Sequence, residues 1–107
     1  MRVYVAGPYT LGDVVLNVRA AVLAGDRLLA AGHTPYVPHL TMFWHMLAPR
    51  PVEDWYDLDL QWLEVCDVLV RLPGESKGAD KECEVAERLG MEVYTGPDPV
   101  GDFLGDM

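Results

Sequence analysis

Short apolar runs alternate along the chain with longer stretches in which apolar residues recur at helical spacing. The apolar runs predict strands at residues 2–6, 33–38, 67–72 and 91–94. The helically spaced stretches predict helices at about 12–31, 40–47, 53–65 and 79–89. Strands that alternate with helices indicate an α/β fold with a parallel sheet and right-handed crossovers.

The run at 67–72 is apolar enough to predict a central strand. Parallel sheets of this kind bind ligands beyond the carboxyl ends of their strands. The loops that meet this edge lie at residues 7–13, 38–45 and 73–78. Residues 1–95 therefore form the predicted α/β domain. Residues 96–107 mix Gly, Pro and Asp, which predicts an acidic tail or an arm that docks on a partner subunit.

Acidic residues dominate the second half of the chain. The formal net charge is −9, and residues 53–107 carry four Lys or Arg against fifteen Asp or Glu. Such a surface repels a phosphate backbone, which indicates a small ligand rather than a nucleic acid polymer. No run approaches the roughly 18–20 apolar residues that span a bilayer, and the N-terminus lacks a signal-peptide pattern. With only two cysteines, we expect a cytoplasmic protein with reduced thiols.

Glu82 lies on the apolar face of the helix predicted at 79–89. Apolar residues follow it by three, four and seven positions, whereas Glu84 and Glu87 point elsewhere. Burial raises the pKa of such an acid, while the positive start of a helix lowers it. An ionised carboxylate there suits a nucleophile or an acceptor for a ligand hydroxyl. A purely structural role, in which the acid only interacts with the helix start, stays open.

Asp59 also lies on a face that should be packed. It follows Trp55 by four residues and precedes Trp62 by three, while Asp57 lies roughly opposite and is expected in solvent. The position suits a functional acid, a buried cap partner or a salt bridge.

The turn formed by Gly7, Pro8 and Tyr9 places open backbone and a phenol at the end of the first strand. It is neither a dinucleotide-binding glycine fingerprint nor a P-loop, and we expect no cofactor. Trp44 belongs to an aromatic group that is mostly core but could stack on a base. No helix or strand would bring together the three histidines, so we expect no metal site; they are His33, His39 and His45.

Ser76, Lys77 and Gly78 precede the helix that carries Glu82. Backbone N–H groups, a hydroxyl and a lysine could hold an anion at this point. Taken alone, plain N-capping by Ser76 explains the same residues.

Three segments together resemble the nucleoside 2-deoxyribosyltransferase superfamily. They are Tyr-Val-Ala-Gly-Pro-Tyr at 4–9, Asp59-Leu60 eight residues before Asp67, and Ser-Lys-Gly-Ala-Asp-Lys-Glu at 76–82. The similarity spans residues 2–95 and is greatest to a short, poorly characterised branch labelled only as a domain of unknown function. It implies a Rossmann-like, flavodoxin-type three-layer fold with a parallel sheet of four or five strands.

The resemblance implies cleavage or transfer at the N-glycosidic bond of a (deoxy)nucleoside or nucleoside 5′-monophosphate. It assigns Glu82 as the nucleophile, Asp59 as the acid/base that handles the proton of the base, and Tyr9 as the residue that orients Glu82. A pair of acids is what glycosidic cleavage with retention requires. The implied assembly is a homodimer or a higher homo-oligomer. The implied substrate-binding residues are Gly7, Pro8, Ser76, Lys77, Gly78 and Trp44.

Ser76 also bears on the substrate. Family members that use free nucleosides have an aspartate six residues before the nucleophile, whereas the chain resembles the 2′-deoxynucleoside 5′-monophosphate N-hydrolases in having a serine there. A serine hydroxyl beside Lys77 would accept a phosphate. Against this, the first loop has no arginine, and Asp13 adds negative charge. An inactive nucleotide-binding or sensing module, or a structural building block, are the alternatives.

Overall fold

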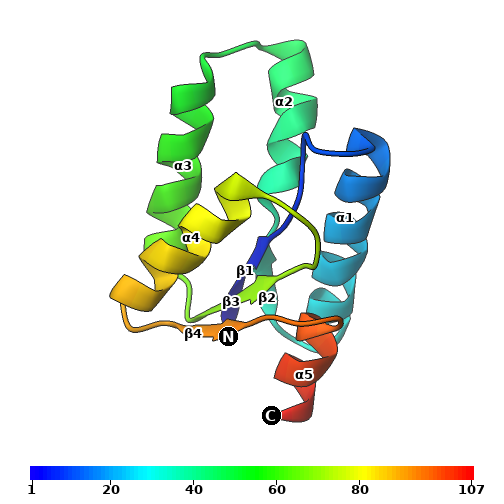
Figure 1. The fold of residues 1–107 in the computed structure, drawn as a ribbon, viewed down its shortest axis with the longest axis vertical. Helices are drawn as coiled ribbons and strands as arrows, with labels where there is room; N and C mark the ends of the chain where they lie inside the picture. The colour runs from blue at the N-terminus through cyan, green and yellow to red at the C-terminus, as the bar shows by residue number, and fades with distance from the viewer.

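The computed structural model describes residues 1–107 and realises the predicted order of strands and helices (Figure 1). The strands are β1 (Arg2–Ala6), β2 (Thr34–Tyr36), β3 (Val68–Arg71) and β4 (Glu92–Tyr94). The helices are α1 (Val14–Ala30), the 3-10 turn η1 (Pro38–Leu40), α2 (Thr41–Leu47), α3 (Val52–Glu64), α4 (Lys77–Arg88) and α5 (Pro99–Gly105). Helix α4 therefore begins two residues before the start that its apolar spacing predicts.

The four strands form one parallel sheet in the order β2-β1-β3-β4. This is the strand order of flavodoxin-type folds, and it confirms the predicted Rossmann-like α/β architecture. Since the chain passes from β2 across β1 to β3, the topological switch point lies between β1 and β3. A ligand site is expected at the carboxyl ends of these two strands.

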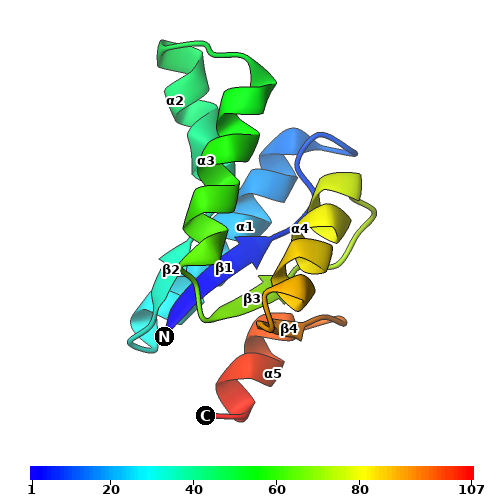
Figure 2. The same ribbon diagram turned by 90° about the vertical axis from the view of Figure 1, so that its left-hand side faces the viewer.

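Helices cover both faces of the sheet. Helices α1 and α5 pack on one face, and α3 and α4 pack on the other (Figure 1). Helices α2 and α3 extend together beyond the carboxyl edge of the sheet, as Figure 2 shows from the side. The contact between Trp44 and Trp55, with ring centroids 5.1 Å apart, joins these two helices.

Side chains along β1 point alternately to the two faces of the sheet. Val3 and Val5 point toward α1 and α5, whereas Tyr4 and Ala6 point toward α3 and α4. Each cluster continues through β3, where Leu69 faces the same side as Tyr4. A fully buried phenol thereby lies under α4.

The C-terminal segment at 96–107 is not the loose tail that was one of its two expected forms; docking on a partner subunit stays a prediction. The segment forms α5, which packs on the sheet and on α1 of the same chain. Asp98 caps the helix by accepting a hydrogen bond from the Gly101 N–H, and it pairs with Arg27 at 2.9 Å. Val100 and Phe103 are fully buried. These two apolar residues lie three positions apart in a single helical turn. Because Gly and Asp stand between them, the sequence shows no helical pattern of apolar residues there.

Phe103→Ala is expected to lower the free energy of unfolding by about 3–5 kcal/mol, because it leaves a cavity between α5 and the sheet. Urea denaturation followed by circular dichroism measures the change. Leu16→Ala is the control: Leu16 is 60% exposed on α1, so the expected change is within about 0.5 kcal/mol. Equal stability of Phe103→Ala and the unaltered chain would contradict the docking of α5.

Candidate active site

Glu82 lies in the second turn of α4, so the position at which this helix begins determines where its side chain points. Ser76 caps α4 through its Oγ, which accepts a hydrogen bond from the Ala79 N–H at 3.1 Å. Five residues into the helix, Glu82 turns toward the sheet, where the Tyr4 phenol donates a hydrogen bond to its Oε2. Glu84 and Glu87 are exposed, as their helical positions predict.

The surroundings of Glu82 disfavour its charge. Burial is the main cause, and together with the nearby Asp59 carboxylate it raises the pKa of Glu82 to about 7, against the opposing effect of the Tyr4 hydrogen bond. Burial and the neighbouring carboxylates raise the pKa of Tyr4 far above its ordinary value. Tyr4 therefore remains a protonated donor that always presents its O–H to Glu82.

Asp59 has a partner of the same kind. It lies half-buried on α3, and the Tyr36 phenol at the end of β2 donates a hydrogen bond to its Oδ1 at 2.9 Å. Burial raises the pKa of Asp59 to about 6, and the hydrogen bond from Tyr36 opposes that rise. Asp57 is exposed, as predicted. No ion pair involves Asp59, so the salt-bridge interpretation does not apply.

The two carboxyl groups share one site. The Tyr4 and Tyr36 rings that hold them are in contact, with centroids 5.5 Å apart. The charge of Asp59 acts on both Glu82 and Tyr4. Two acids with raised pKa values and separate hydrogen-bond donors can divide the work of nucleophile and proton carrier.

The contact expected between Tyr9 and Glu82 is made instead by Tyr4. Tyr9 is partly exposed, and its ring meets the edge of His39 at a centroid distance of 6.0 Å. His39 in turn bonds through Nε2 to the Pro8 carbonyl at 3.0 Å, which ties η1 to the exit loop of β1. Tyr4, whose side chain points into the α3/α4 side of the sheet, is therefore the tyrosine placed to orient Glu82, and Tyr9 is not.

The loop before α4 is braced by Arg71, which the sequence patterns did not single out. Its guanidinium donates to the carbonyls of Leu72 at 2.6 Å and Gly74 at 2.8 Å, and to that of Ser76 at 3.3 Å. It also pairs with Asp80 at 2.8 Å. An arginine that ends an otherwise apolar strand is the signal that could have indicated this role. Because its donors are engaged, Arg71 shapes the loop that carries Ser76.

Comparison with known proteins assigns a family. The family model for the domain of unknown function DUF7768 matches residues 1–95. The chain belongs to this family. No curated protein matches the DUF7768 chain significantly.

A solved structure shows the same fold. The 2-deoxyribosyltransferase from the psychrotolerant bacterium Bacillus psychrosaccharolyticus superposes on the DUF7768 chain with a TM-score of 0.68. The superposition covers 92% of this chain and 73% of that enzyme, at 18% sequence identity. At this identity the likeness establishes the α/β fold that the two proteins share.

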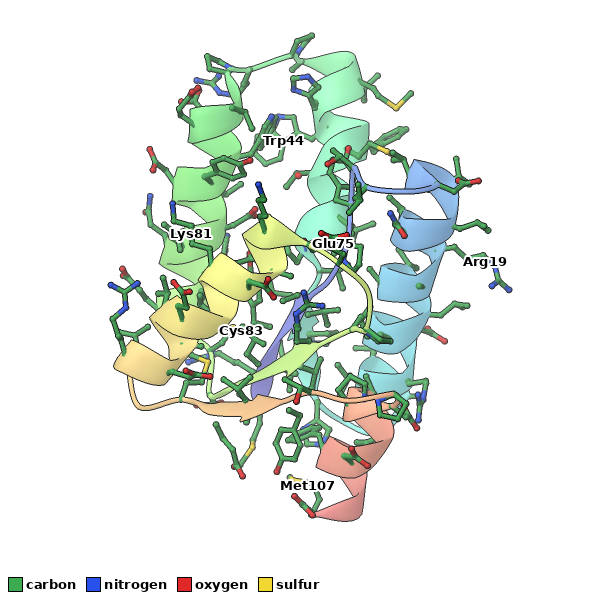
Figure 3. The ribbon with its side chains drawn as sticks, in the orientation of Figure 1. Arg19, Trp44, Glu75, Lys81, Cys83 and Met107 are labelled. Atoms are coloured by element: carbon green, nitrogen blue, oxygen red, sulfur yellow. The ribbon has the colours of Figure 1, made fainter.

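Trp44 of the DUF7768 chain packs edge-on against Trp55 of α3. It is 53% exposed and sits between the upper parts of α2 and α3 (Figure 3). It lines an open hollow of ≈ 500 Å³ whose wall also includes Tyr36. Tyr36, the hydrogen-bond donor to Asp59, therefore borders the hollow that Trp44 lines. The other lining residues are Pro35, Val37, Leu40, Thr41, Leu58 and Trp62.

Other candidate chemistry in the DUF7768 chain has separate partners. His45 accepts a hydrogen bond from the Trp55 indole at 3.0 Å, and His33 contacts the N-terminal amine at 3.2 Å. No group of three or more His, Cys, Asp or Glu is placed to hold a metal ion.

Both cysteines are free, and burial raises the pKa of each thiol to about 11. No helix has the length and apolarity to cross a membrane.

Proposed function

We propose that this protein cleaves or transfers the N-glycosidic bond of a (deoxy)nucleoside or nucleoside 5′-monophosphate, with Glu82 as the nucleophile. The pair of half-buried carboxyl groups, each hydrogen-bonded by its own phenol, carries the proposal. Tyr4, which bonds Glu82, lies on β1, one of the two strands that flank the topological switch point, and α/β folds bind ligands at such points. The fold shared with a 2-deoxyribosyltransferase and the sequence resemblance to that superfamily support the same chemistry.

In the proposed reaction, a Glu82 oxygen attacks the anomeric carbon on the face opposite the base. The C–N bond breaks, its electron pair moves onto the base nitrogen, and Asp59 supplies the proton that the leaving base takes up. Water, or a second base in the case of transfer, then attacks the anomeric carbon of the glycosyl ester, and the bond from that carbon to the Glu82 oxygen breaks, which restores the carboxylate. Asp59 accepts the proton that this second step releases.

The loop at 76–78 is the proposed site for the 5′ end of the substrate. Ser76 Oγ accepts the Ala79 N–H, and a hydroxyl that accepts one hydrogen bond can still donate its own proton to an oxygen of the ligand. Lys77 is exposed in the first turn of α4 beside it, with the backbone N–H of Gly78. These groups support a 5′-phosphate, while Asp80, which pairs with Arg71, and Asp13 in the first loop carry negative charge. The experiment therefore includes both free nucleosides and monophosphates.

A panel of deoxynucleosides, ribonucleosides and their 5′-monophosphates, with and without a free acceptor base, tests the proposed function. Chromatography of the reaction mixture detects free base or an exchanged nucleoside. We expect release or exchange with at least one member of the panel. Absence of any product contradicts the proposal. Ligand-induced thermal stabilisation without product indicates a binding module instead.

We also propose that the protein forms a homodimer through α2 and the adjoining side of α3. Large exposed apolar surfaces commonly mark protein–protein contacts. Light scattering after gel filtration is expected to give about twice the chain mass of 11.9 kDa, and Leu47→Asp to reduce it to the monomer. Leu89→Asp, at the far end of α4, is the control and should leave the dimer intact. The exposed apolar residues are Phe43, Trp44, Met46, Leu47, Val52, Tyr56 and Trp62.

A further inference from the structure

Tyr36 holds Asp59 without help from any cation. The Tyr36 O–H at 2.9 Å is the hydrogen-bond donor that the Asp59 carboxyl has, and Asp59 takes part in none of the three ion pairs of the chain. A half-buried carboxylate with a single donor depends strongly on that donor. Loss of the phenolic O–H would therefore free both the orientation and the charge of Asp59.

The Tyr36 ring is itself held in place by aromatic neighbours. It stacks on Trp62 with centroids 5.6 Å apart and an interplanar angle of 21°. On another side it meets Tyr4 at 5.5 Å, and Tyr4 and Tyr36 are paired residues in the β1–β2 register. Trp62 follows Asp59 by three residues on α3, so one helix supplies both the carboxyl and the ring that packs against its donor.

We propose that Tyr36 is a positioning residue, whose phenol, packed against Trp62 and Tyr4, fixes the Asp59 carboxyl in the orientation from which it exchanges a proton with the leaving group. This inference rests on the proposed function for its catalytic meaning. Tyr36 acts through Asp59 and need not touch the sugar. It forms a second phenol–carboxyl pair beside the pair of Tyr4 and Glu82.

The groups around Asp59 determine in which direction loss of the Tyr36 hydroxyl changes the pKa of Asp59. Tyr36 contributes a donor from β2, while Tyr4 on β1 and Glu82 on α4 are the titratable groups on the neighbouring elements, with Cys66 just beyond the end of α3. Burial raises the pKa of Tyr36 above its ordinary value, so its O–H persists over the whole accessible pH range. The O–H stabilises the ionised carboxylate. Its removal leaves burial unopposed and raises the pKa of Asp59 above about 6.

Tyr36→Phe tests the proposal because it keeps the ring and removes only the hydroxyl. The ¹³Cγ resonance of Asp59, followed by NMR against pH in the substrate-free protein, is expected to titrate about one pH unit higher than in the unaltered chain. Tyr56→Phe is the matched control on α3, since Tyr56 is 60% exposed, and it should leave the Asp59 titration unchanged. An Asp59 midpoint that does not move in Tyr36→Phe overturns the proposal.

Two further measurements separate this proposal from the proposed function. The Tyr36 ¹³Cζ resonance of the unaltered protein should shift with pH at the same midpoint as the Asp59 ¹³Cγ resonance. This measurement needs neither a folded variant nor a substrate. Different midpoints for the two resonances overturn the proposal. With a substrate found in the panel, Tyr36→Phe should move the alkaline limb of the pH profile of kcat/KM, which reports loss of the Asp59 proton, to higher pH. An unmoved profile overturns the catalytic part. If no substrate turns over while the NMR midpoints shift as expected, the proposed function fails and the positioning of Asp59 by Tyr36 stands.

Discussion

Glu82→Gln is expected to reduce turnover by about 10³-fold or more on any substrate that the protein cleaves, because an amide cannot attack the anomeric carbon. The side chain keeps its shape, and its carbonyl oxygen can still accept the Tyr4 hydrogen bond. Ligand affinity, measured by calorimetry, should therefore stay within a few-fold of the unaltered protein. Full activity of Glu82→Gln would exclude Glu82 as the nucleophile.

The same substitution is expected to stabilise the protein at neutral and alkaline pH. The folded-state pKa of Glu82, about 7, lies above the ordinary value of 4.5. The stability contributed by the protonated acid is therefore fully present below pH 4.5 and is lost as pH rises through 7. The amide of the variant carries no charge at any pH, so Glu82→Gln should gain about 1–3 kcal/mol at pH 8 and little at pH 4.

Thermal melting between pH 4 and pH 9 measures this difference. Glu84→Gln is the control, because Glu84 is exposed on the same helix and its removal should leave the pH dependence of Tm unchanged. A Glu82→Gln variant with the same pH dependence as the unaltered protein would show that Glu82 ionises freely. We expect the variant to be more stable and inactive, because the reaction requires an ionised acid at a buried position where its charge destabilises the fold.

The sheet and the two acids follow from patterns that act over short distances. The apolar runs at 2–6 and 67–72 predict strands because both faces of a central parallel strand are buried. Glu82 and Asp59 are recognisable because a charge on the apolar side of a helix breaks a periodic pattern. The placement of Asp57 on the opposite, solvent-facing side follows from the same local rule.

The role of Tyr4 could not be predicted, because Tyr4 does not break the apolar pattern of its strand. It lies in a strand whose two faces are both buried, so a tyrosine there has the same pattern as a core residue. Its hydroxyl finds its partner 78 residues further along the chain, a pairing that no local spacing encodes. Tyr36 is paired with Asp59 across β2 and α3 in the same manner.

Helix α5 and Arg71 depend on tertiary contacts. A helix of seven residues is unstable alone, and only the burial of Val100 and Phe103 against the sheet makes it form. Arg71 is only 13% exposed and satisfies carbonyls that a sequence pattern cannot locate. Both features become visible only once the strands are assembled.

Asp59→Asn is expected to lower kcat by about 10²–10⁴-fold on substrates whose base must be protonated as it leaves. Asparagine can still occupy the site beside Tyr36, but it cannot carry the proton to the base. The size of the loss should depend on the leaving group. A nucleoside of N7-methylated guanine carries a positive charge on its base and departs without a proton, so Asp59→Asn should slow its cleavage by less than about tenfold.

The pH profile supplies the second measurement on Asp59. A general acid must be protonated and the nucleophile ionised, and burial raises the pKa of Asp59 to about 6 and that of Glu82 to about 7. Activity on ordinary substrates should therefore be greatest between these two values and fall on either side, with the alkaline limb set by loss of the Asp59 proton. In Asp59→Asn that alkaline limb should vanish, while the limb set by ionisation of Glu82 should remain. Asp57→Asn, at an exposed position two residues away, should change neither rate nor profile. Equal losses on the neutral and the cationic leaving group would assign Asp59 a structural role, because a missing proton matters only where the departing base needs one.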